Sequence, residues 1–329
     1  MSRIKKEIYN LWDSLCWYRQ KSTQVNNCFI TCSGKTDGAG AQIQAVLSTM
    51  LFAHEMKVKY VHTPFKKISY PFYYGKNGHN TEDDGSYEAK WESFTNLGYN
   101  ELAVDKIKLD KLNILKVRHP REVKKVKNTL YVIPDCHKFA DRYPNLYLKL
   151  LPKFQNKYAQ YTDKPGLYFD PSKINVAIHT RRGDVTREDS KRYTSNSFIL
   201  SIIKELSSVL SSSEKEPVFH IYSQGCAKEF LEIDHNAVVF RLNECPFTTF
   251  HHMVSADVLV MAKSSFSYSA ALFSKGVIIY LPFWHKPLRN WIVVNKNGTF
   301  DKKEFKDVVR NKIIGKLQKP IPICNHNTS

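Results

Sequence analysis

The sequence predicts an α/β protein whose two Rossmann-like domains face each other across a cleft. Its 329 residues are enough for two domains of ordinary size. Short runs of β-branched and aromatic residues alternate with segments of helical periodicity along most of the chain. The stretch YTDKPGLYFDPSK, 161–173, is rich in turn-forming residues and separates two groups of these units. We therefore expect an N-terminal domain over 1–165 and a C-terminal domain over 166–329.

The N-terminal domain opens with a strand, a helix and a second strand. NCFITCS, 27–33, and KVKYVHT, 57–63, have the composition of strands. Between them, IQAVLSTMLFAHEM, 43–56, repeats apolar residues at helical spacing. This order is the βαβ unit from which parallel sheets are built.

The rest of this domain is less regular. The polar stretch GKNGHNTEDDGS, 75–86, predicts a surface loop. NTLYVIPD, 128–135, predicts another strand, and the segment 139–160 predicts a helix interrupted at Pro144 and at Pro152.

The C-terminal domain alternates strands and helices with more regularity. Five strands joined by four crossovers indicate a doubly wound, Rossmann-like sheet. The strands are predicted at 174–180, 217–223, 237–242, 257–262 and 276–282, and the helices at 195–210, 227–233, 246–256 and 264–274.

The net charge of +18 raises the question of nucleic-acid binding. Lysines are spread along the chain, with a modest basic cluster at Arg118, Arg121, Lys124, Lys125 and Lys127. No arginine-rich tail, paired zinc ligands or aromatic RNA-binding signature accompanies them. A solvated lysine-rich surface is the favoured interpretation, so we expect no nucleic-acid partner. Attraction of phosphates on a substrate remains open.

Targeting and cysteine content favour a soluble cytoplasmic protein. No window holds about 18 consecutive apolar residues, and Glu7, Asp13 and Arg19 interrupt any apolar core of a signal peptide. The seven cysteines form no dense framework, and no second pair completes a zinc site with Cys28 and Cys32. We therefore expect no metal and, weakly supported by the cysteines, a reducing compartment.

Three loops at predicted strand ends carry unusual chemistry. The first, TDGAGAQ, 36–42, precedes a helix whose free N–H groups favour an anion. Gly38 and Gly40 allow close backbone approach there. It is not the dinucleotide fingerprint, because Ile43 stands in place of the third glycine. A plain tight turn explains this loop equally well.

The second loop is HTRRGD, 179–184, at the end of a predicted buried strand. Arg181 and Arg182 are adjacent, so both can turn toward the cleft only where the strand ends. Arginine is always charged and binds phosphate oxygens bidentately, which suits a diphosphate leaving group. The alternatives are a surface network with Asp184 and a fortuitous RGD tripeptide.

The third loop is ADVLVMAKSSFSYSAAL, 256–272. Asp257 opens an apolar strand, and Ser264, Ser265 and Ser267 follow at the predicted helix start. Serines there either cap the helix or donate hydrogen bonds to phosphate.

Two further features are weaker. YSQG, 222–225, could line a base or ribose pocket. His251 and His252 lie in a predicted helix without a third metal ligand.

Together these motifs resemble the GDP-fucose-dependent α-1,2 and α-1,6 fucosyltransferases and the related protein O-fucosyltransferases. HTRRGD is similar to their His-x-Arg-Arg-x-Asp motif, and DGAGAQIQA is similar to their glycine-rich N-terminal segment. ADVLVMAKSSFSYSAAL resembles their C-terminal Asp-led strand and Ser-rich turn. The three matches stand in family order within about residues 34–281.

The resemblance implies a GT-B-type glycosyltransferase that is inverting, metal-independent and without a cofactor. Residues 1–165 would lie on the acceptor side, and residues 166–329 would bind the nucleotide-sugar donor. The loop 75–87 is a candidate acceptor loop. The implied partners are GDP-fucose and a glycan acceptor.

The resemblance also implies catalytic roles. Arg181 and Arg182 would grip the diphosphate of GDP-fucose, and Arg181 would stabilise departing GDP. An acidic residue eight positions beyond the first motif arginine is the implied base in the α-1,6 branch. Asp189 occupies that offset here, with Glu188 beside it.

The remaining implied contacts bind the donor. His179 would approach the ribose and phosphates, Asp257 the nucleoside, and Ser264 with Ser265 the phosphates. Three residues of the glycine loop would bring the N-terminal domain against the donor: Gly38, Gly40 and Gln42.

Two departures from the family pattern leave the donor open. Ala41 replaces the usual asparagine before Gln42, and YSQG replaces a Ser-Asp-Asp type of loop. The expected function is transfer of L-fucose from GDP-fucose to a hydroxyl of a glycan. One alternative is a GT-B enzyme using another nucleotide sugar. The other is a non-enzymatic protein that binds nucleic acid or acidic glycans through its basic surface.

Overall fold

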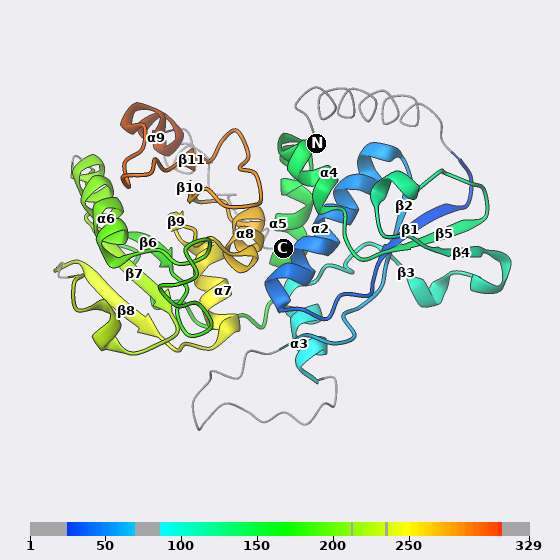
Figure 1. Cartoon of the computed structure of the whole chain (residues 1–329), viewed down its shortest axis with the longest axis horizontal. Helices are drawn as coiled ribbons and strands as arrows, with labels where there is room; N and C mark the ends of the chain where they lie inside the picture. The colour runs from blue at the N-terminus through cyan, green and yellow to red at the C-terminus, as the bar shows by residue number, and fades with distance from the viewer. Residues whose placement is uncertain (1–24, 70–85, 212, 234–235, 311–329) are drawn as a thin grey trace, which may run out of the picture.

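The structure, a computed structural model, describes residues 25–69, 86–211, 213–233 and 236–310. It contains two parallel β-sheets with helices around and between them (Figure 1). One sheet comes from the N-terminal half of the chain and the other from the C-terminal half. This arrangement confirms the predicted α/β fold class with two facing Rossmann-like units. The boundary at residue 165 stays a prediction, and it falls in the irregular stretch 161–170.

The N-terminal sheet has five strands in the order β3-β2-β1-β5-β4. Its central strand is buried because β1 pairs in parallel with β5 over its whole length and with β2 on the other side. The strands are β1 (Cys28–Cys32), β2 (Lys59–His62), β3 (Leu102–Ala103), β4 (Asn113–Lys116) and β5 (Thr129–Ile133). The sequence patterns did not predict β3 and β4, which are short edge strands with few buried residues.

Helix α2 ends where it was predicted to end, whereas α3 was not predicted. The segment predicted as an interrupted helix is broken before Pro144 and again at Leu150, into α4, the 3-10 helix η4 and α5. Pro152 lies in the first turn of α5, where proline is tolerated. The helices are α2 (Ala39–Met56), α3 (Ser86–Thr95), η1 (Val104–Lys106), η2 (Leu109–Lys111), η3 (Pro120–Glu122), α4 (His137–Arg142), η4 (Pro144–Lys149) and α5 (Leu151–Gln160).

The C-terminal sheet has six strands in the order β11-β10-β9-β6-β7-β8. Neighbouring strands of this sheet pair in parallel, and β6 lies between β7 and β9. The strands are β6 (Ile174–His179), β7 (Pro217–Ser223), β8 (Val238–Leu242), β9 (Val258–Val260), β10 (Val277–Tyr280) and β11 (Ile292–Val293). The short strand β11 was not predicted.

Three of the four predicted crossover helices of this half are α-helices. The segment predicted as a helix at 227–233 is instead a single 3-10 turn over Ala227–Phe230. The helices are α6 (Asn196–Leu210), η5 (Ala227–Phe230), α7 (Pro246–Ser255), α8 (Ser265–Phe273) and α9 (Lys302–Val309).

The two halves share one hydrophobic core. Helices α2 and α8 pack side by side between the sheets (Figure 1). Trp91 of α3 meets Phe250 of α7 with ring centroids 5.7 Å apart, within a cluster that spans both halves. A second cluster lies within the C-terminal half and includes Ile202 of α6 and Val258 of β9. The relative position of the two sheets is therefore set by buried apolar contact.

Each sheet has a point where the chain reverses its direction of winding. In the N-terminal sheet the reversal lies between β1 and β5, and in the C-terminal sheet between β6 and β9. Loops at the carboxyl ends of such strands diverge and leave a crevice where ligands bind in α/β proteins. Both reversal points thus predict a site, and the structure brings them together.

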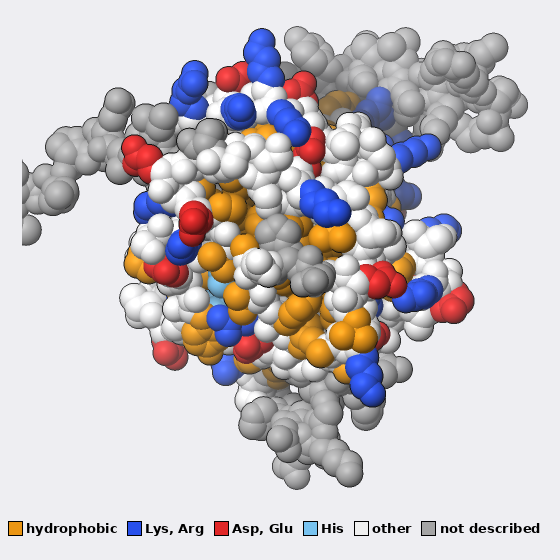
Figure 2. Space-filling view, turned by 90° about the vertical axis from the view of Figure 1, so that its left-hand side faces the viewer, with side chains coloured by type: hydrophobic (Ala, Val, Ile, Leu, Met, Phe, Trp, Pro, Cys, Tyr) orange, Lys and Arg blue, Asp and Glu red, His pale blue; other side chains and the backbone are white. Residues whose placement is uncertain are grey.

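The outer face of the C-terminal half shows how surface charge is distributed. Figure 2 shows lysines and arginines interspersed with acidic side chains around an apolar centre, without one continuous basic patch on that face. Among exposed apolar side chains, Leu231 and Phe240 lie beside or on the edge strand β8. In the part of the chain that the structure describes, no helix is long and apolar enough to cross a bilayer.

Candidate active site

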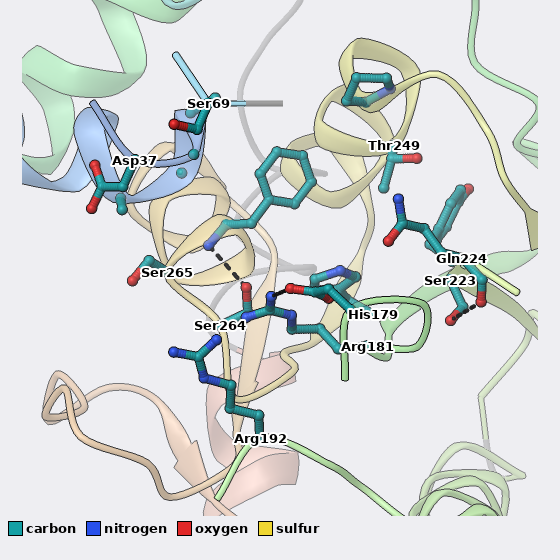
Figure 3. A pocket seen from close by; sticks show the side chains of 18 of the residues that line it. Asp37, Ser69, His179, Arg181, Arg192, Ser223, Gln224, Thr249, Ser264 and Ser265 are labelled. Carbon is teal, nitrogen blue, oxygen red and sulfur yellow. Dashed lines mark hydrogen bonds and ion pairs between the residues drawn. The ribbon is translucent and has the colours of Figure 1, made fainter. Parts of the chain in front are cut away.

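A cleft of about 580 Å³ lies where the two reversal points meet. Loops from both sheets form its walls, and Figure 3 shows Asp37, Arg181, Ser264 and Ser265 around one open space. The lining residues used below are Lys35, Asp37, Gly38 and Gly40 near β1, His137 after β5, His179, Arg181, Arg182 and Asp184 at the end of β6, Arg192, Ser223, Gln224, Glu244, Thr249, Ser264, Ser265 and His285.

Arg181 lines the cleft. It lies two residues after the end of β6, and its side chain is 21% exposed. Its guanidinium forms an ion pair with Asp184, three residues on. This contact is the Arg–Asp pair that the sequence left as an alternative. Because the pair lies in the cleft wall, it holds the guanidinium at the cleft as well as partly neutralising it.

Arg182 differs from the expectation that both arginines turn into the cleft. It touches the lining, but its guanidinium is committed within the C-terminal half. It donates to Thr194 O at 2.9 Å and to Asn196 Oδ1 at 2.8 Å, and it stacks on Tyr193 at 4.2 Å. Only 3% of Arg182 is exposed. Neighbouring side chains leave a strand on opposite sides, so one arginine faces the cleft and the other the interior.

The start of α8 opens onto the cleft. Ser264 is the N-cap, and its Oγ accepts from the Phe266 amide at 3.2 Å. Ser265 is the first helical residue and is half-buried in the cleft wall. The expected pair therefore lies together, with a capping role for Ser264. The unpaired amides of this helix end give the cleft a positive electrostatic potential.

The glycine loop divides into different roles. Gly38 is the N-cap position of α2 and lines the cleft. Gly40 also lines it, but its Cβ position is occupied by the backbone of Phe266. Gln42, the third expected donor contact of this loop, lies outside the cleft lining and is 5% exposed. Its Nε2 donates to Asp37 O at 2.6 Å and to Lys67 O at 2.7 Å, which holds the loop in place.

His179 is the last residue of β6 and lines the cleft as expected. Burial, together with a smaller effect of the positive charge of Arg181, lowers the pKa of its imidazole to about 3. Among the described residues, its buried Nδ1 has no hydrogen-bond partner. A neutral imidazole with an unpaired nitrogen is free to donate to, or accept from, a bound ligand.

The structure does not place Asp257, the expected nucleoside contact, in the cleft lining. Asp257 precedes β9, so it lies at the amino end of that strand, whereas the cleft is at the carboxyl ends. Its Oδ2 accepts from the Asn175 amide at 3.0 Å, and its own amide donates to Asn175 O at 3.0 Å. The residue joins the starts of β6 and β9.

The two expected bases also lie outside the cleft lining. Glu188 accepts a hydrogen bond from the Thr186 hydroxyl, which lowers the pKa of its carboxyl and makes it a weaker base. Asp189 lies 3.7 Å from Arg192 in an ion pair on the same loop. Short local contacts therefore engage both carboxylates on the loop that follows β6.

The structure adds residues that the sequence motifs did not indicate. His285 of the loop after β10 lies with both Asp141 oxygens 3.1 Å from its Nδ1. His137 packs edge-on against His285, with ring centroids 5.1 Å apart. Asp141 and His285 are 144 positions apart, so no local pattern could reveal the pair. On the same side, Lys35 and Asp37 form an ion pair of 3.1 Å.

Residues that follow β7 and β8 form the end of the cleft opposite Lys35 and Asp37. Ser223 and Gln224 of the YSQG segment line it as expected, together with Thr249 (Figure 3). Glu244 also lines it, and in the described part of the chain its carboxylate has no hydrogen bond or ion pair. This end thus offers amide, hydroxyl and carboxylate groups.

The paired histidines of α7 are structural. His251 Nδ1 lies 3.0 Å from the Tyr158 hydroxyl, and His252 Nδ1 lies 2.5 Å from the Tyr222 hydroxyl. Across the ranges that the structure describes, no group of three or more His, Cys, Asp or Glu residues is arranged to hold a metal ion. The candidate acceptor loop 75–87 falls outside the described residues except for its last two positions.

Comparison with known families bears on this cleft. Residues 153–292 match the model of glycosyl transferase family 11. The matched range holds β6 to β10 and the loops with Arg181, Ser264 and Glu244, so the enzyme class expected from the motifs is confirmed as glycosyltransferase. No curated protein matches the chain.

Solved structures with a similar chain path include two fucosyltransferase-related proteins. A mutant of FUT1 from Arabidopsis thaliana in complex with GDP is 11% identical, with 86% of this chain and 74% of that chain covered and a TM-score of 0.42. The fucosyltransferase NodZ from Bradyrhizobium is 10% identical, with 84% and 98% covered and a TM-score of 0.36. The heptosyltransferase WaaC of E. coli, with an ADP-heptose analogue, is 12% identical, with 88% and 99% covered and a TM-score of 0.38.

Proposed function

We propose that this glycosyltransferase transfers L-fucose from GDP-fucose to a hydroxyl of a glycan acceptor, with inversion at the sugar carbon. The donor would lie in the cleft, with its diphosphate at Arg181 and the N-terminus of α8. The N-terminal half would supply the acceptor side. The family 11 match supports the enzyme class. The donor, the linkage and the stereochemistry are the parts that we propose.

The observation that carries the proposal is a cradle for an anion made by both halves of the molecule. The N-termini of α2 and α8 both lie at the cleft, at Gly38 and Ser265 respectively, and Arg181 lies in the same wall. Helix N-termini and arginine both favour phosphate oxygens. A diphosphate that gains negative charge as it leaves would therefore be stabilised from two sides.

The chemistry needs little covalent participation by the protein. The acceptor oxygen would attack the anomeric carbon as the bond from that carbon to the diphosphate oxygen breaks. The electron pair of the broken bond would go to the diphosphate, where Arg181 and the α8 amides offset its charge. Attack on the face opposite the leaving group would invert the configuration.

The β7–β8 end of the cleft supports guanine as the base. Guanine carries N–H donors on one edge, at N1 and at its exocyclic amine, and a carboxylate accepts from both. Glu244 offers such a carboxylate without a competing partner among the described residues. Adenine and uracil lack this pair of donors. We therefore expect GDP to bind more tightly than ADP or UDP.

A nucleotide screen separates the proposed donor from other nucleotide sugars. GDP at about 100 times its Kd would raise the free energy of unfolding by roughly 2.7 kcal/mol and shift the melting temperature upward. ADP and UDP at the same concentration would shift it less. A larger shift with UDP would instead favour the alternative of another nucleotide-sugar donor. Steep salt-dependent binding of polynucleotide without any nucleotide shift would favour the basic binding protein.

The direct test replaces the central arginine. Arg181→Ala is expected to lower turnover with GDP-fucose by about 10²–10³-fold, because a preorganised donor to the leaving group is lost. Arg187→Ala is the matched control, since Arg187 is exposed on the same loop and lies outside the cleft lining. Turnover of Arg181→Ala equal to that of Arg187→Ala would show that the proposed role is wrong.

The proposed location is the cytoplasm. The cysteines in the described part of the chain are free, and three of them are buried: Cys28, Cys32 and Cys136. Burial raises the pKa of the Cys32 thiol to about 12, so it stays protonated and unreactive. Such cysteines are compatible with a reducing compartment. Fractionation of cells that express the tagged protein would check this.

A further inference from the structure

We propose that His285 is the catalytic base for the acceptor hydroxyl and that Asp141 is the residue that positions it. The proposal rests on the glycosyl transfer proposed above, because it names the group that removes the acceptor's proton. It replaces the expected bases Glu188 and Asp189, which lie outside the cleft lining.

The geometry of the pair fixes which nitrogen of His285 is available. Both carboxylate oxygens of Asp141 lie 3.1 Å from Nδ1, so this nitrogen carries the proton and donates to Asp141. Nε2 then has its lone pair free. It lies 3.5 Å from the Ser265 hydroxyl, a contact too long to occupy it firmly. A substrate hydroxyl can therefore approach Nε2 beside Ser265.

The imidazole is held so that it has little freedom to turn. The His285 ring lies 5.4 Å from the Tyr268 ring and 5.1 Å from the His137 ring, and it is 4% exposed. The Tyr280 hydroxyl donates to the His285 carbonyl, and the Tyr268 hydroxyl donates to Lys286 O at 2.8 Å. The backbone and the ring are thus both fixed at the cleft wall.

His285 lies between the proposed diphosphate site and the N-terminal half, which is the proposed acceptor side. It stands next to Ser265, at the start of α8, where the proposed diphosphate site begins. Asp141 belongs to α4 of the N-terminal half, and His285 belongs to the C-terminal half. The base is therefore complete only when the two halves are in contact, which couples catalysis to their correct placement.

Other acid–base groups of the lining are less suited. Asp184 is paired with Arg181, and Asp37 is paired with Lys35 at 3.1 Å. Burial lowers the pKa of His137 to about 4 and that of His179 to about 3, so both accept protons weakly. His285 differs from both histidines because a carboxylate lies within hydrogen-bond distance of its Nδ1 and orients the ring, as in the Ser-His-Asp arrangement of hydrolases.

The acceptor O–H proton passes to Nε2 of His285 while the acceptor oxygen bonds to the anomeric carbon. The bond from that carbon to the diphosphate oxygen breaks, and its electron pair leaves with the diphosphate. His285 becomes an imidazolium whose charge is offset by Asp141, and it later returns the proton to solvent or to GDP.

The groups that face His285 from neighbouring elements are Asp141 and His137 from α4, Tyr268 and Ser265 from α8, and Tyr280 from β10. Asp141 is the only carboxylate of this set. It accepts from Nδ1 and so holds the tautomer in which Nε2 is the basic nitrogen. Replacing this carboxylate by an amide should therefore lower turnover without changing GDP affinity.

The experiment measures transfer from GDP-fucose and GDP affinity in three variants of the full chain. His285→Gln is expected to lower kcat by about 10²–10⁴-fold with GDP affinity within threefold of wild type. Asp141→Asn is expected to lower kcat while GDP affinity stays within threefold of wild type, because an amide does not hold the Nδ1–H tautomer of His285. Asn145→Ala is the matched control, because it removes another contact between the halves, the bond from the Arg289 amide at 2.6 Å.

A second measurement guards against a merely structural effect. Added imidazole should restore part of the turnover of His285→Ala, because a free base can enter the space that the side chain leaves. The proposal is overturned if His285→Gln retains kcat within threefold of wild type. It is also overturned if the Gln variant loses GDP binding along with transfer, or if Asn145→Ala reproduces the loss of kcat. A wild-type protein that transfers no sugar would instead overturn the proposed function, and this inference with it.

Discussion

Gly40 of α2 and Phe266 of α8 are in backbone contact across the two halves of the molecule. A Cβ at Gly40 would lie 2.4 Å from the Cα of Phe266, a distance that no real Cβ contact shows. The Ser269 hydroxyl donates to Gly40 O at 2.8 Å and fixes the same approach. Because the N-termini of α2 and α8 both line the cleft, this contact sets the distance between the two helix ends that face the donor.

The first prediction concerns this contact. Gly40→Ala is expected to lower the free energy of unfolding by about 1–3 kcal/mol, because the added methyl group forces α2 and α8 apart. Weaker GDP affinity should accompany it. Gly38→Ala is the control, since the nearest atom to its Cβ position is Ser69 O at 4.0 Å and the expected change is within about 0.5 kcal/mol. Denaturant unfolding measures both, and equal effects of the two variants would contradict the prediction.

The second prediction separates the adjacent arginines. Arg182→Ala is expected to lower the free energy of unfolding by roughly 2–4 kcal/mol, since it leaves Thr194 O and Asn196 Oδ1 without their donor. Arg181→Ala is expected to change it by less than about 0.5 kcal/mol, because that ion pair is partly exposed. Chemical unfolding of the two variants gives the comparison. A more stable Arg182→Ala protein than Arg181→Ala would rule out this division.

The third prediction is a loss of stability in mild acid. Burial, with smaller effects of Arg241 and His252, lowers the pKa of His220 from 6.5 to about 4. Between these values the unfolded chain binds a proton that the folded protein does not, so the free energy of unfolding falls as pH drops through this window. His220→Gln should reduce the slope by up to about 1.4 kcal/mol per pH unit. The slope comes from urea unfolding at pH 4–7, and an unchanged slope would count against the argument.

The fourth prediction tests the displaced aspartate. Asp257→Ala is expected to lower the free energy of unfolding by about 1–3 kcal/mol, because the Asn175 amide loses its acceptor. GDP affinity is expected to stay within twofold of wild type, since Asp257 lies outside the cleft lining. Calorimetric titration with GDP checks this. A tenfold loss of affinity would restore the role that the family resemblance implies.

The parts of the site that the sequence anticipated are those carried by local order. His179 and Arg181 follow a buried strand, and Ser264 and Ser265 start a helix, so both loops had to lie at strand ends. Gly38 precedes α2 in the same way, and Gly40 lies in the first turn of that helix. A parallel sheet collects such ends at one edge, which is why these residues meet.

Three residues of the predicted site do not point into the cleft. Side-chain direction or strand polarity turns each of them toward another partner, and they are Arg182, Gln42 and Asp257. A strand alternates its side chains, so a neighbour in sequence is not a neighbour in the cleft. The sequence motif alone does not show which of the two adjacent arginines faces the cleft and which faces the protein interior.

The sequence by itself determined the alternation of strands and helices, the two parallel sheets and the loops that end at the cleft, because these follow from local periodicity and turn chemistry. Only the tertiary structure decided that Arg181 rather than Arg182 faces the donor site, and that Asp141 and His285 meet from opposite halves. Those outcomes depend on packing between α2 and α8 and on contacts between residues far apart in the chain, which no local pattern encodes.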